Sequence, residues 1–326
     1  MLAPSKIRVT VCACTYRRPR GLAALLEGLG EQNFEHVPRP ILRIVIADNE
    51  GSTRARQICD QFRLCSDIPI EYLHEQQRGI SFARNACLAR LGDDCDFFAM
   101  IDDDEVPHPD WVEQLMLIQQ RTDADVVQGR VLPELPDGAP GWIARGRYFD
   151  WQLKSDEARA AQQHGYAVLR RARTNNVLVR FAVVRAMGLW FDPRLALTGG
   201  EDIAFFEAIN AAGYRLVYAP LACVRDIIPP ERTTLEYLWR TWYRVGCNER
   251  WRGPHLGKPH ASRWRLLSRR WKRTGTHAFL LGLALLVGNL LRGRASLDHL
   301  GEGILLIARG LGRAAGLLGI RYQQYR

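Results

Sequence analysis

The chain has 326 residues, a hydrophobic content of 47% and a formal net charge of +10. This length and composition are ordinary for a globular protein with a sizeable core, in one large domain or in a domain with an appendage. The eight cysteines form no Cys-x-x-Cys pair and no cysteine–histidine cluster with zinc spacing, which argues against a zinc module. We expect them to be small buried hydrophobic residues of a reducing compartment.

The positive charge is concentrated toward the carboxyl-terminal end. From Glu231 onward the sequence has 18 lysines and arginines against 5 aspartates and glutamates. We therefore predict one domain over residues 1–230 and a basic helical region over residues 231–326. Residues 1–6 contain no apolar signal-peptide segment, so we expect the first domain to lie in the cytoplasm.

Strand-like and helical patterns alternate along the first domain. Short apolar runs predict strands at residues 8–14, 41–47, 70–73, 97–101, 126–131, 174–179 and 215–219. Between most of these runs, apolar residues recur at helical spacing, as at Leu22, Leu25, Leu26 and Leu29. The alternation predicts an α/β fold with a mostly parallel sheet flanked by helices. Residues 132–171 lack a clear period, which is typical of a functional or mobile segment.

Four acidic residues follow the strand predicted at 97–101 without a spacer. They are Asp102, Asp103, Asp104 and Glu105. Like charges so close together raise one another's pKa, and a divalent cation with oxygen ligands would relieve the repulsion. The alternative is an acidic turn that only caps the helix starting near Asp110. Because capping needs a single carboxylate, the sequence favours metal binding by Asp102 and Asp104.

Two further polar groups stand at the ends of neighbouring predicted strands. They are Thr15-Tyr16-Arg17-Arg18 and Asp48-Asn49. Parallel strands bring these ends to the edge that carries the acidic cluster, where ligands of α/β sheets bind. A nucleoside diphosphate fits the set, with a base near Tyr16 and Asp48 and phosphates near Arg17, Arg18 or Arg84. Taken singly, Asp48-Asn49 is also typical of a turn or a helix cap.

A glycine pair precedes two carboxylates in Gly199-Gly200-Glu201-Asp202. The glycines form a flexible hinge, and the carboxylates begin a predicted helix that ends near residue 212. A carboxylate in this position can accept a proton from an incoming hydroxyl group. Acidic residues at a helix start also stabilise the helix dipole, so capping is the alternative.

Together these motifs resemble the family 2 glycosyltransferases over residues 8–251. The similar stretches are Cys12-Ala13-Cys14-Thr15-Tyr16-Arg17-Arg18-Pro19, Ile46-Ala47-Asp48-Asn49, Gly79-Ile80-Ser81-Phe82-Ala83-Arg84-Asn85, Ile101-Asp102-Asp103-Asp104 and Gly199-Gly200-Glu201-Asp202. Cys14 and Arg17 stand where the family more usually has proline and asparagine. The resemblance implies a GT-A fold, a nucleotide-sugar donor and an inverting reaction.

The resemblance also assigns roles to residues. It places the donor nucleotide sugar against Thr15, Tyr16, Arg18, Asp48, Arg84, Asp102 and Asp103. A Mg²⁺ or Mn²⁺ ion would be held by Asp102 and Asp104 of the DxD motif. Asp202 would be the general base, and Glu201 would position the acceptor.

Within the family, the motifs are most similar to the succinoglycan-type exopolysaccharide glucosyltransferases. This similarity implies UDP-glucose as donor and a lipid-linked oligosaccharide acceptor at the cytoplasmic membrane face. The Gln-x-x-Arg-Trp motif of processive synthases is only partly matched by Cys247-Asn248-Glu249-Arg250-Trp251. Arg244 or Arg250 is still a candidate to contact the departing diphosphate.

The basic region combines positive charge with apolar sequence. Residues 263–273 are densely basic with Trp264 and Trp271 between the charges, and residues 278–291 are almost purely apolar. Basic residues beside tryptophans suit an anionic membrane surface, and the apolar run is shorter than the ~20 residues of a spanning helix. We predict an interfacial or shallowly inserted helix, with residues 304–320 as a second amphipathic segment. A helix packed on the domain is the alternative; no nucleic-acid module accompanies the charge.

The sequence thus predicts a metal-dependent, inverting UDP-sugar transferase bound peripherally to the inner face of the cell membrane. Two other classes stay open. A nucleotidyltransferase of the same fold would release pyrophosphate and would not need a base at Asp202. A catalytically silent membrane scaffold would not need the repulsive acidic cluster. Nothing in the sequence indicates the oligomeric state.

Overall fold

The computed structural model describes residues 6–150, 153–249, 263–294 and 296–323, with side chains throughout except at 263–275. The chain divides into two compact units. Unit 1 comprises Met1–Pro133, Trp151–Ala196 and Glu201–Ile227, and unit 2 comprises Glu134–Asp150, Leu197–Gly200 and Ile228–Arg326. The chain crosses between the units several times, the last time at 227/228, and the predicted division into residues 1–230 and 231–326 stays a prediction.

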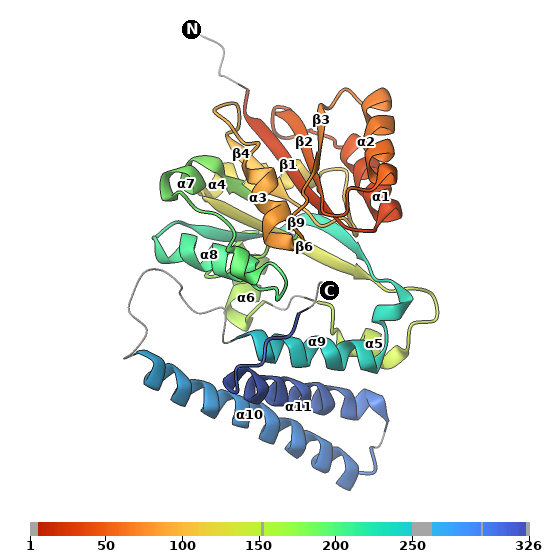
Figure 1. Ribbon diagram of the computed structural model, residues 1–326, viewed down its shortest axis with the longest axis vertical. Coiled ribbons are helices and arrows are strands. Elements are labelled where there is room, and N and C mark those ends of the chain that lie inside the picture. Colours follow the sequence, from red (N-terminus) through yellow and green to blue (C-terminus); the bar gives the residue numbers. More distant parts are fainter. Residues whose placement is uncertain (1–5, 151–152, 250–262, 295, 324–326) are drawn as a thin grey trace. The chain divides into compact units, whose positions relative to one another are not determined.

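A nine-stranded sheet forms the centre of unit 1 (Figure 1), in the order β3-β2-β1-β4-β8-β6-β9-β5, with β7 beside β9. Its first half is parallel: β1 pairs with β2 and with β4, and β2 pairs with β3. Its second half is antiparallel, because β8 runs against β4 and β6 while β5 and β7 run against β9. The strands are β1 (Arg8–Thr15), β2 (Ile41–Asp48), β3 (Ile70–His74), β4 (Phe97–Met100), β5 (Glu105–Pro107), β6 (Val126–Glu134), β7 (Ala167–Leu169), β8 (Val177–Arg180) and β9 (Leu216–Ile227).

Helices cover both faces of this sheet. Val9 and Val11 of β1 belong to the hydrophobic cluster with α1, α2 and α4, whereas Cys12 belongs to the cluster with α3, α7 and α8. This alternation explains why the strands are apolar on both faces and read as continuous runs. The helices of unit 1 are α1 (Pro19–Gly30), α2 (Thr53–Cys65), α3 (Ile80–Leu88), α4 (Trp111–Thr122), α6 (Ser155–His164), α7 (Phe181–Met187) and α8 (Glu201–Ala211), with the short 3₁₀ helix η1 (Pro193–Leu195).

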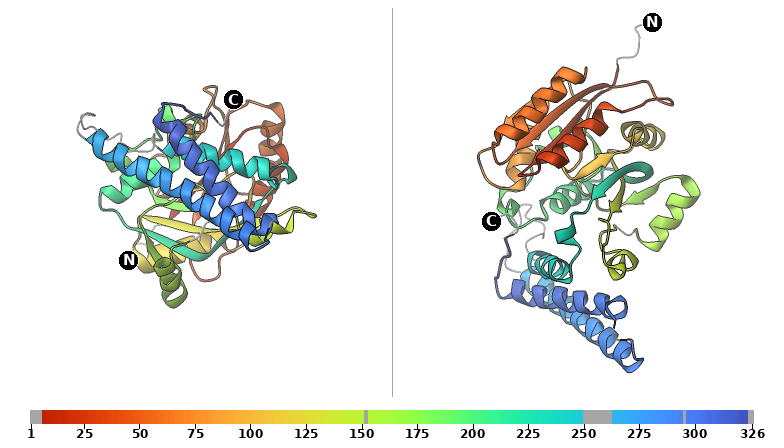
Figure 2. Two further views of the ribbon diagram at one scale, coloured as in Figure 1. Left: turned by 90° about the horizontal axis from the view of Figure 1, so that it is seen from below. Right: turned by 90° about the vertical axis from the view of Figure 1, so that its right-hand side faces the viewer.

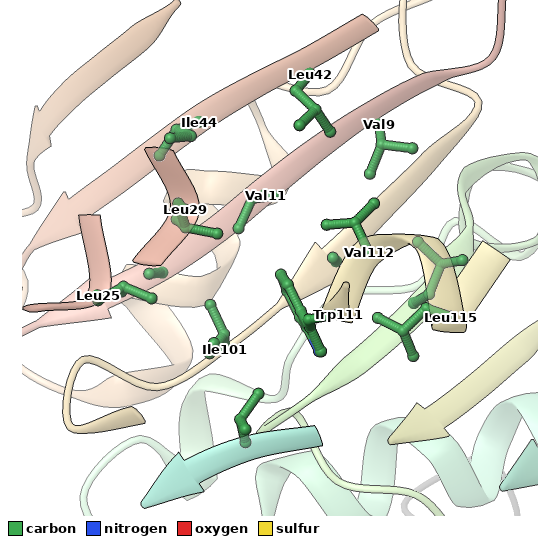
Figure 3. Close-up of a cluster of buried hydrophobic side chains, with 14 of the residues drawn as sticks. Val9, Val11, Leu25, Leu29, Leu42, Ile44, Ile101, Trp111, Val112 and Leu115 are labelled. Atoms are coloured by element: carbon green, nitrogen blue, oxygen red, sulfur yellow. The ribbon is translucent and has the colours of Figure 1, made fainter. Parts of the chain in front are cut away.

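The first cluster packs α1 and α4 against β1, β2 and the end of β4 (Figure 3). Trp111, at the start of α4, is fully buried at its centre, and its indole Nε1 donates a hydrogen bond of 2.7 Å to Asn176 Oδ1. A buried indole needs such a partner, since an unpaired N–H loses its hydration without compensation. Trp111 therefore ties α4 to the loop before β8.

Unit 2 is helical and contains α5 (Gly141–Gly146), the 3₁₀ helix η2 (Pro230–Arg232), α9 (Leu235–Asn248), α10 (Arg263–Leu291) and α11 (Leu297–Leu317). In the views of Figure 2, α10 and α11 run side by side, and α11 also packs on α9. At Glu249, just after α9, Oε2 accepts a hydrogen bond of 2.6 Å from Arg313 Nε, and Oε1 accepts one of 3.0 Å from Arg309 Nε. These bonds attach the end of α9 to α11.

The predicted fold class is confirmed, with three local differences. The sheet is parallel only from β3 to β4, since an apolar run does not encode strand direction. Residues 132–171, which lacked a period, contain α5, α6 and β7. The predicted tail helix at 278–291 begins already at Arg263, so the basic and apolar stretches belong to one helix.

The tail helices α10 and α11 pack on one another within unit 2, and both the membrane-surface prediction and its alternative, packing on the first domain, stay predictions. In the part of the chain that the structure describes, no helix is both long enough and apolar enough to span a membrane. The structure does not describe Arg250 and Trp251, nor the side chains of Trp264 and Trp271, so the predictions for these residues lie outside it.

Candidate active site

Three polar strand ends meet at one edge of the sheet, as predicted. Thr15 at the end of β1 is the register partner of Asp48 at the end of β2. On the other side of β1, Cys12 is the register partner of Met100, so the acidic loop after β4 lies next to Thr15. The parallel half of the sheet therefore places the candidate nucleotide and metal groups together.

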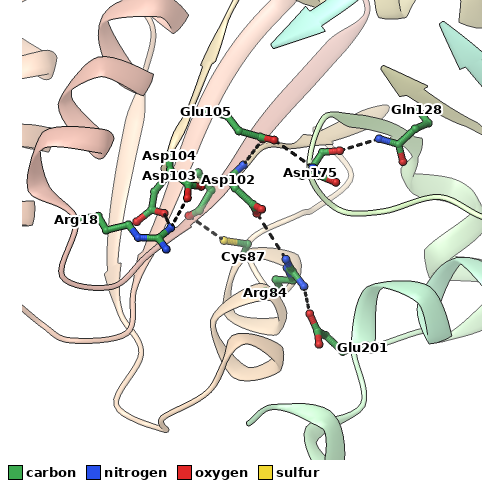
Figure 4. A network of polar contacts seen from close by, with 11 residues as sticks. Arg18, Arg84, Cys87, Asp102, Asp103, Asp104, Glu105, Gln128, Asn175 and Glu201 are labelled. Carbon is green, nitrogen blue, oxygen red and sulfur yellow. Dashed lines mark hydrogen bonds and ion pairs between the residues drawn. The ribbon is translucent and has the colours of Figure 1, made fainter. Parts of the chain in front are cut away.

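Asp103 attaches the acidic loop to the end of β1 (Figure 4). Its Oδ2 accepts a hydrogen bond of 2.8 Å from Thr15 Oγ1 and a longer one, 3.4 Å, from the Tyr16 backbone N–H. Its Oδ1 accepts a hydrogen bond of 2.8 Å from Arg18 Nη1. Asp103 is buried, and all of these partners are protein groups. Its carboxylate therefore fixes the conformation of the acidic loop. The predicted contacts of Thr15 and Asp103 with the donor stay predictions.

The same arginine also pairs with the next carboxylate. Arg18 Nη1 lies 2.9 Å from Asp104 Oδ2. Burial alone would lower the pKa of Arg18, but the carboxylates of Asp103 and Asp104 raise it above its ordinary value, so the guanidinium stays charged. Arg18 is the positive charge that balances this side of the acidic loop.

Arg84 joins two parts of the site. It is buried on α3, forms an ion pair with Glu201 at the start of α8, and has Nη2 at 3.6 Å from Asp102 Oδ1 (Figure 4). Burial raises the pKa of Glu201, and the charge of Arg84 opposes this. Asp102 is only partly exposed, and this partial loss of solvent raises its pKa to about 6, with Arg84 opposing and Asp104 and Asp103 adding to the rise. One buried cation is thereby paired with both the acidic loop after β4 and the start of α8.

Glu105 holds the acidic loop through hydrogen bonds. Its Oε2 accepts a hydrogen bond of 3.0 Å from the Asp102 backbone N–H, and its Oε1 accepts one of 3.2 Å from Asn175 Nδ2. Gln128 Nε2 in turn donates to the Asn175 carbonyl oxygen at 2.7 Å. Burial, followed by the charge of Asp102, raises the pKa of Glu105 well above its ordinary value. Sequence reasoning saw only a run of acids here and missed this supporting role, because Asn175 and Gln128 lie far away in the chain.

Asp48 holds the turn into α2. Its Oδ1 accepts a hydrogen bond of 2.8 Å from the Glu50 N–H, and its Oδ2 accepts bonds from the Ser52 N–H at 2.8 Å and the Tyr72 hydroxyl at 2.7 Å. The residue is 1% exposed. This geometry matches the turn alternative, and base recognition by Asp48 stays a prediction. Tyr16 lies at the same edge, with the guanidinium carbons of Arg17 and Arg78 at 5.0 and 5.8 Å from its ring centroid.

The stretch Gly199-Gly200-Glu201-Asp202 leads into α8. Gly199 and Gly200 have φ angles of +76° and +93°, which a side chain would strain, so the turn requires both glycines. Glu201 follows as a buried residue, and Asp202 is partly exposed. Among the residues that the structure describes, Glu201 Oε2 has no hydrogen-bond partner. A buried carboxylate oxygen without a partner is a natural binding point for a ligand hydroxyl group.

The oxygen donors of the acidic loop fit a divalent cation. The side chain of Asp102 is 44% exposed, and that of Asp104 is 17% exposed. The described part of the chain contains no group of three or more His, Cys, Asp or Glu residues arranged to hold a metal. Mg²⁺-type sites need no such cage, because one or two carboxylates, water and substrate phosphates complete the coordination.

Comparisons with known proteins identify the family of the chain. The family described as Glycosyl transferase family 2 matches residues 10–184. The succinoglycan biosynthesis protein ExoM of Rhizobium meliloti is 32% identical over 74% of this chain and 73% of its own. A glucosyl-dolichyl phosphate glucuronosyltransferase of Haloferax volcanii is 27% identical over 72% of each chain.

Solved structures share the fold. The mannosyltransferase PcManGT of Pyrobaculum calidifontis, solved with GDP-Man and Mn²⁺, has a TM-score of 0.60 at 16% identity and covers 95% of this chain and 87% of its own. TarS 1–349 of S. aureus, solved with UDP, has a TM-score of 0.52 at 13% identity, covering 97% and 93%. The fold is therefore the GT-A fold, and the chain belongs to glycosyltransferase family 2.

Proposed function

We propose that this glycosyltransferase transfers a sugar from a UDP-sugar to a hydroxyl group with inversion at the anomeric carbon. The observation that carries the proposal is the position of Arg84. This buried cation contacts Asp102 of the DxD motif and Glu201 of the acceptor-side motif, so the two halves of a transfer site share one charge. The complexes of PcManGT with GDP-Man and Mn²⁺ and of TarS with UDP support a nucleotide-sugar donor.

Each residue of the site has a distinct task in this scheme. Arg18 and Arg84 are positive groups for the diphosphate, and Tyr16 is a packing surface for the base. Asp102 and Asp104 would hold Mg²⁺ or Mn²⁺. When bound, such an ion neutralises charge that develops on the leaving diphosphate.

The carboxylates at the start of α8 act on the acceptor. Asp202 removes the proton of the acceptor hydroxyl group. At the same time the hydroxyl oxygen attacks the anomeric carbon, and the bond from this carbon to the diphosphate breaks. Glu201 Oε2, buried and without a described partner, accepts a hydrogen bond from an acceptor hydroxyl group and so orients the sugar. One displacement inverts the anomeric centre, and no covalent sugar intermediate forms.

We propose glucose as the transferred sugar and a lipid-linked oligosaccharide as the acceptor, in the synthesis of an extracellular or surface polysaccharide. The similarity to the succinoglycan biosynthesis protein ExoM supports this assignment. A lipid-linked acceptor requires the enzyme at a membrane. The tail supports peripheral binding to the inner face of the cell membrane, because six large apolar residues of α10 are between 44% and 83% exposed: Leu280, Leu281, Leu283, Val287, Leu290 and Leu291.

Replacing the base tests the mechanism. We expect Asp202→Asn to lower turnover of UDP-glucose with membrane lipid extracts by roughly 10²- to 10⁴-fold while donor binding stays intact. Glu207→Gln, on the same helix, is the matched control and should keep its activity. Full turnover by Asp202→Asn would remove the base from the scheme.

The products and the nucleotide distinguish the other classes. A sugar transferase releases UDP, whereas a nucleotidyltransferase releases pyrophosphate. Calorimetry should detect Mn²⁺-dependent binding of UDP, with GDP as the comparison, and Asp104→Ala should abolish it. A folded protein that binds neither nucleotide would favour the silent scaffold.

A further inference from the structure

Arg18 lies between two carboxylates of the acidic loop. One nitrogen, Nη1, lies 2.8 Å from Asp103 Oδ1 and 2.9 Å from Asp104 Oδ2. Two carboxylates that converge on one positive nitrogen reproduce the charge arrangement of a metal bound between acidic oxygens. Of these two carboxylates, only Asp104 belongs to the pair that the proposed function gives to the metal.

Arg18 can leave this position, whereas Arg84 is held in place. The Arg18 side chain is 42% exposed, so it can rotate into solvent without opening a cavity. Asp103 would keep its hydrogen bonds from Thr15 Oγ1 and the Tyr16 N–H after the arginine had moved. Arg84 is 7% exposed, and its ion pair with Glu201 fixes it in the site.

We propose that Arg18 is an exchangeable counter-charge that makes metal binding at Asp104 depend on the diphosphate. This inference rests on the proposed function. A divalent cation that approaches Asp104 alone is repelled by the guanidinium and must displace it into water. When a nucleoside diphosphate arrives with the cation, the guanidinium gains a phosphate partner in place of the carboxylate. Cation and nucleotide therefore bind cooperatively. The carboxylates of the acidic loop always face a positive charge, either the Arg18 guanidinium or the divalent cation.

The proposal predicts opposite effects of one substitution on two affinities. Arg18→Gln removes the positive charge, so Mn²⁺ without nucleotide should bind roughly tenfold more tightly. At saturating Mn²⁺, UDP should bind more weakly, because one phosphate contact is lost. The factor by which UDP tightens Mn²⁺ binding should accordingly fall toward 1.

Free Mn²⁺ is measured by its electron paramagnetic resonance signal, and UDP binding by calorimetry, for the full chain. Arg20→Gln is the matched control, since Arg20 is an exposed arginine two residues along on α1. It should leave both affinities and their coupling as in the unchanged protein. Arg18→Lys keeps the charge on a shorter point-like head and should give an intermediate Mn²⁺ affinity.

The outcomes separate the two proposals. If the unchanged protein binds neither UDP nor Mn²⁺, the proposed function fails. If it binds both, but Arg18→Gln leaves the affinity for Mn²⁺ alone unchanged or weaker, the counter-charge role is wrong. Circular dichroism checks that each variant is folded, and Arg18→Met, which also removes the charge, decides the question if Arg18→Gln does not fold; an affinity for Mn²⁺ alone equal to that of the unchanged protein would then contradict the proposal.

Discussion

At the scale of single residues, Arg84 is the side chain on which the site depends most. Arg84 and Glu201 are 117 positions apart in the chain, and both are buried. A buried pair is weak evidence for stability compared with an apolar pair of the same shape, but removing one partner leaves an uncompensated charge. The pair therefore constrains which substitutions the site can accept.

A double-mutant cycle tests this dependence. Arg84→Met leaves Glu201 buried without its cation, so we expect the free energy of unfolding to fall by about 3–5 kcal/mol. The double variant Arg84→Met with Glu201→Gln also lacks the negative charge of Glu201. Much of the lost free energy of unfolding should therefore be recovered. Urea denaturation of the single and double variants measures both values. If the double variant is no more stable than Arg84→Met, the two side chains are not coupled as described.

Some roles of single residues could be predicted from the sequence, and others could not. The strand ends at Thr15, Asp48 and Asp102 were predictable, because parallel pairing of apolar runs brings them to one edge. The internal hydrogen bonds of Asp48 and Asp103 were not, since a carboxylate that binds a ligand and one that holds a turn look alike in sequence. The link from Arg84 to Glu201 depends on tertiary packing, which no local pattern contains.

At the scale of elements, the sequence predicted long apolar runs well and short or polar elements poorly. β1, β2 and β4 begin at the predicted residues, and each ends within one residue of its predicted end. β5 has only three residues and includes a buried acid, so neither its length nor its composition indicates a strand. The helices α5 and α6 lie in a stretch rich in proline, glycine and charge, where packing rather than periodicity decides the structure.

The close contact between α9 and α11 requires glycine at position 312. A Cβ atom at Gly312 would collide with the carbonyl oxygen of Tyr243, whereas one at Gly288 of α10 would meet no atom within 4 Å. Alanine favours helices over glycine by about 1 kcal/mol. We expect Gly288→Ala to raise the unfolding midpoint slightly and Gly312→Ala to lower it by several degrees, as thermal denaturation would show. Equal effects of the two changes would mean that α9 and α11 do not pack closely.

At the scale of the whole molecule, charge and exposed apolar surface are combined in one element. The region from Glu231 onward has 18 basic against 5 acidic residues, and α10 joins the basic run at 263–273 to the exposed apolar residues at 280–291. Exposed leucines and valines at helical spacing are unusual on a protein that stays in water. Combined with adjacent positive charge, they are typical of helices that lie in the surface of an anionic membrane.

This combination predicts two separable contributions to membrane binding. Raising the salt concentration from about 0.1 M to about 1 M shortens the Debye length from about 10 Å to about 3 Å, so the binding that depends on charge should weaken. Leu283→Glu with Val287→Glu should lower the affinity for phosphatidylglycerol vesicles at least roughly tenfold, because two apolar side chains no longer enter the bilayer.

The control for this substitution is Leu64→Glu, which changes an exposed leucine on α2 of unit 1 and should leave vesicle binding unchanged. Vesicle co-sedimentation measures all three proteins under the same conditions. Because a lipid-linked acceptor is confined to the membrane, weaker binding should lower turnover with lipid acceptors but leave UDP binding unchanged. If the α10 variant sediments with vesicles as well as the unchanged protein does, the apolar residues of α10 do not contact lipid, and the positive charge alone must account for any binding that remains.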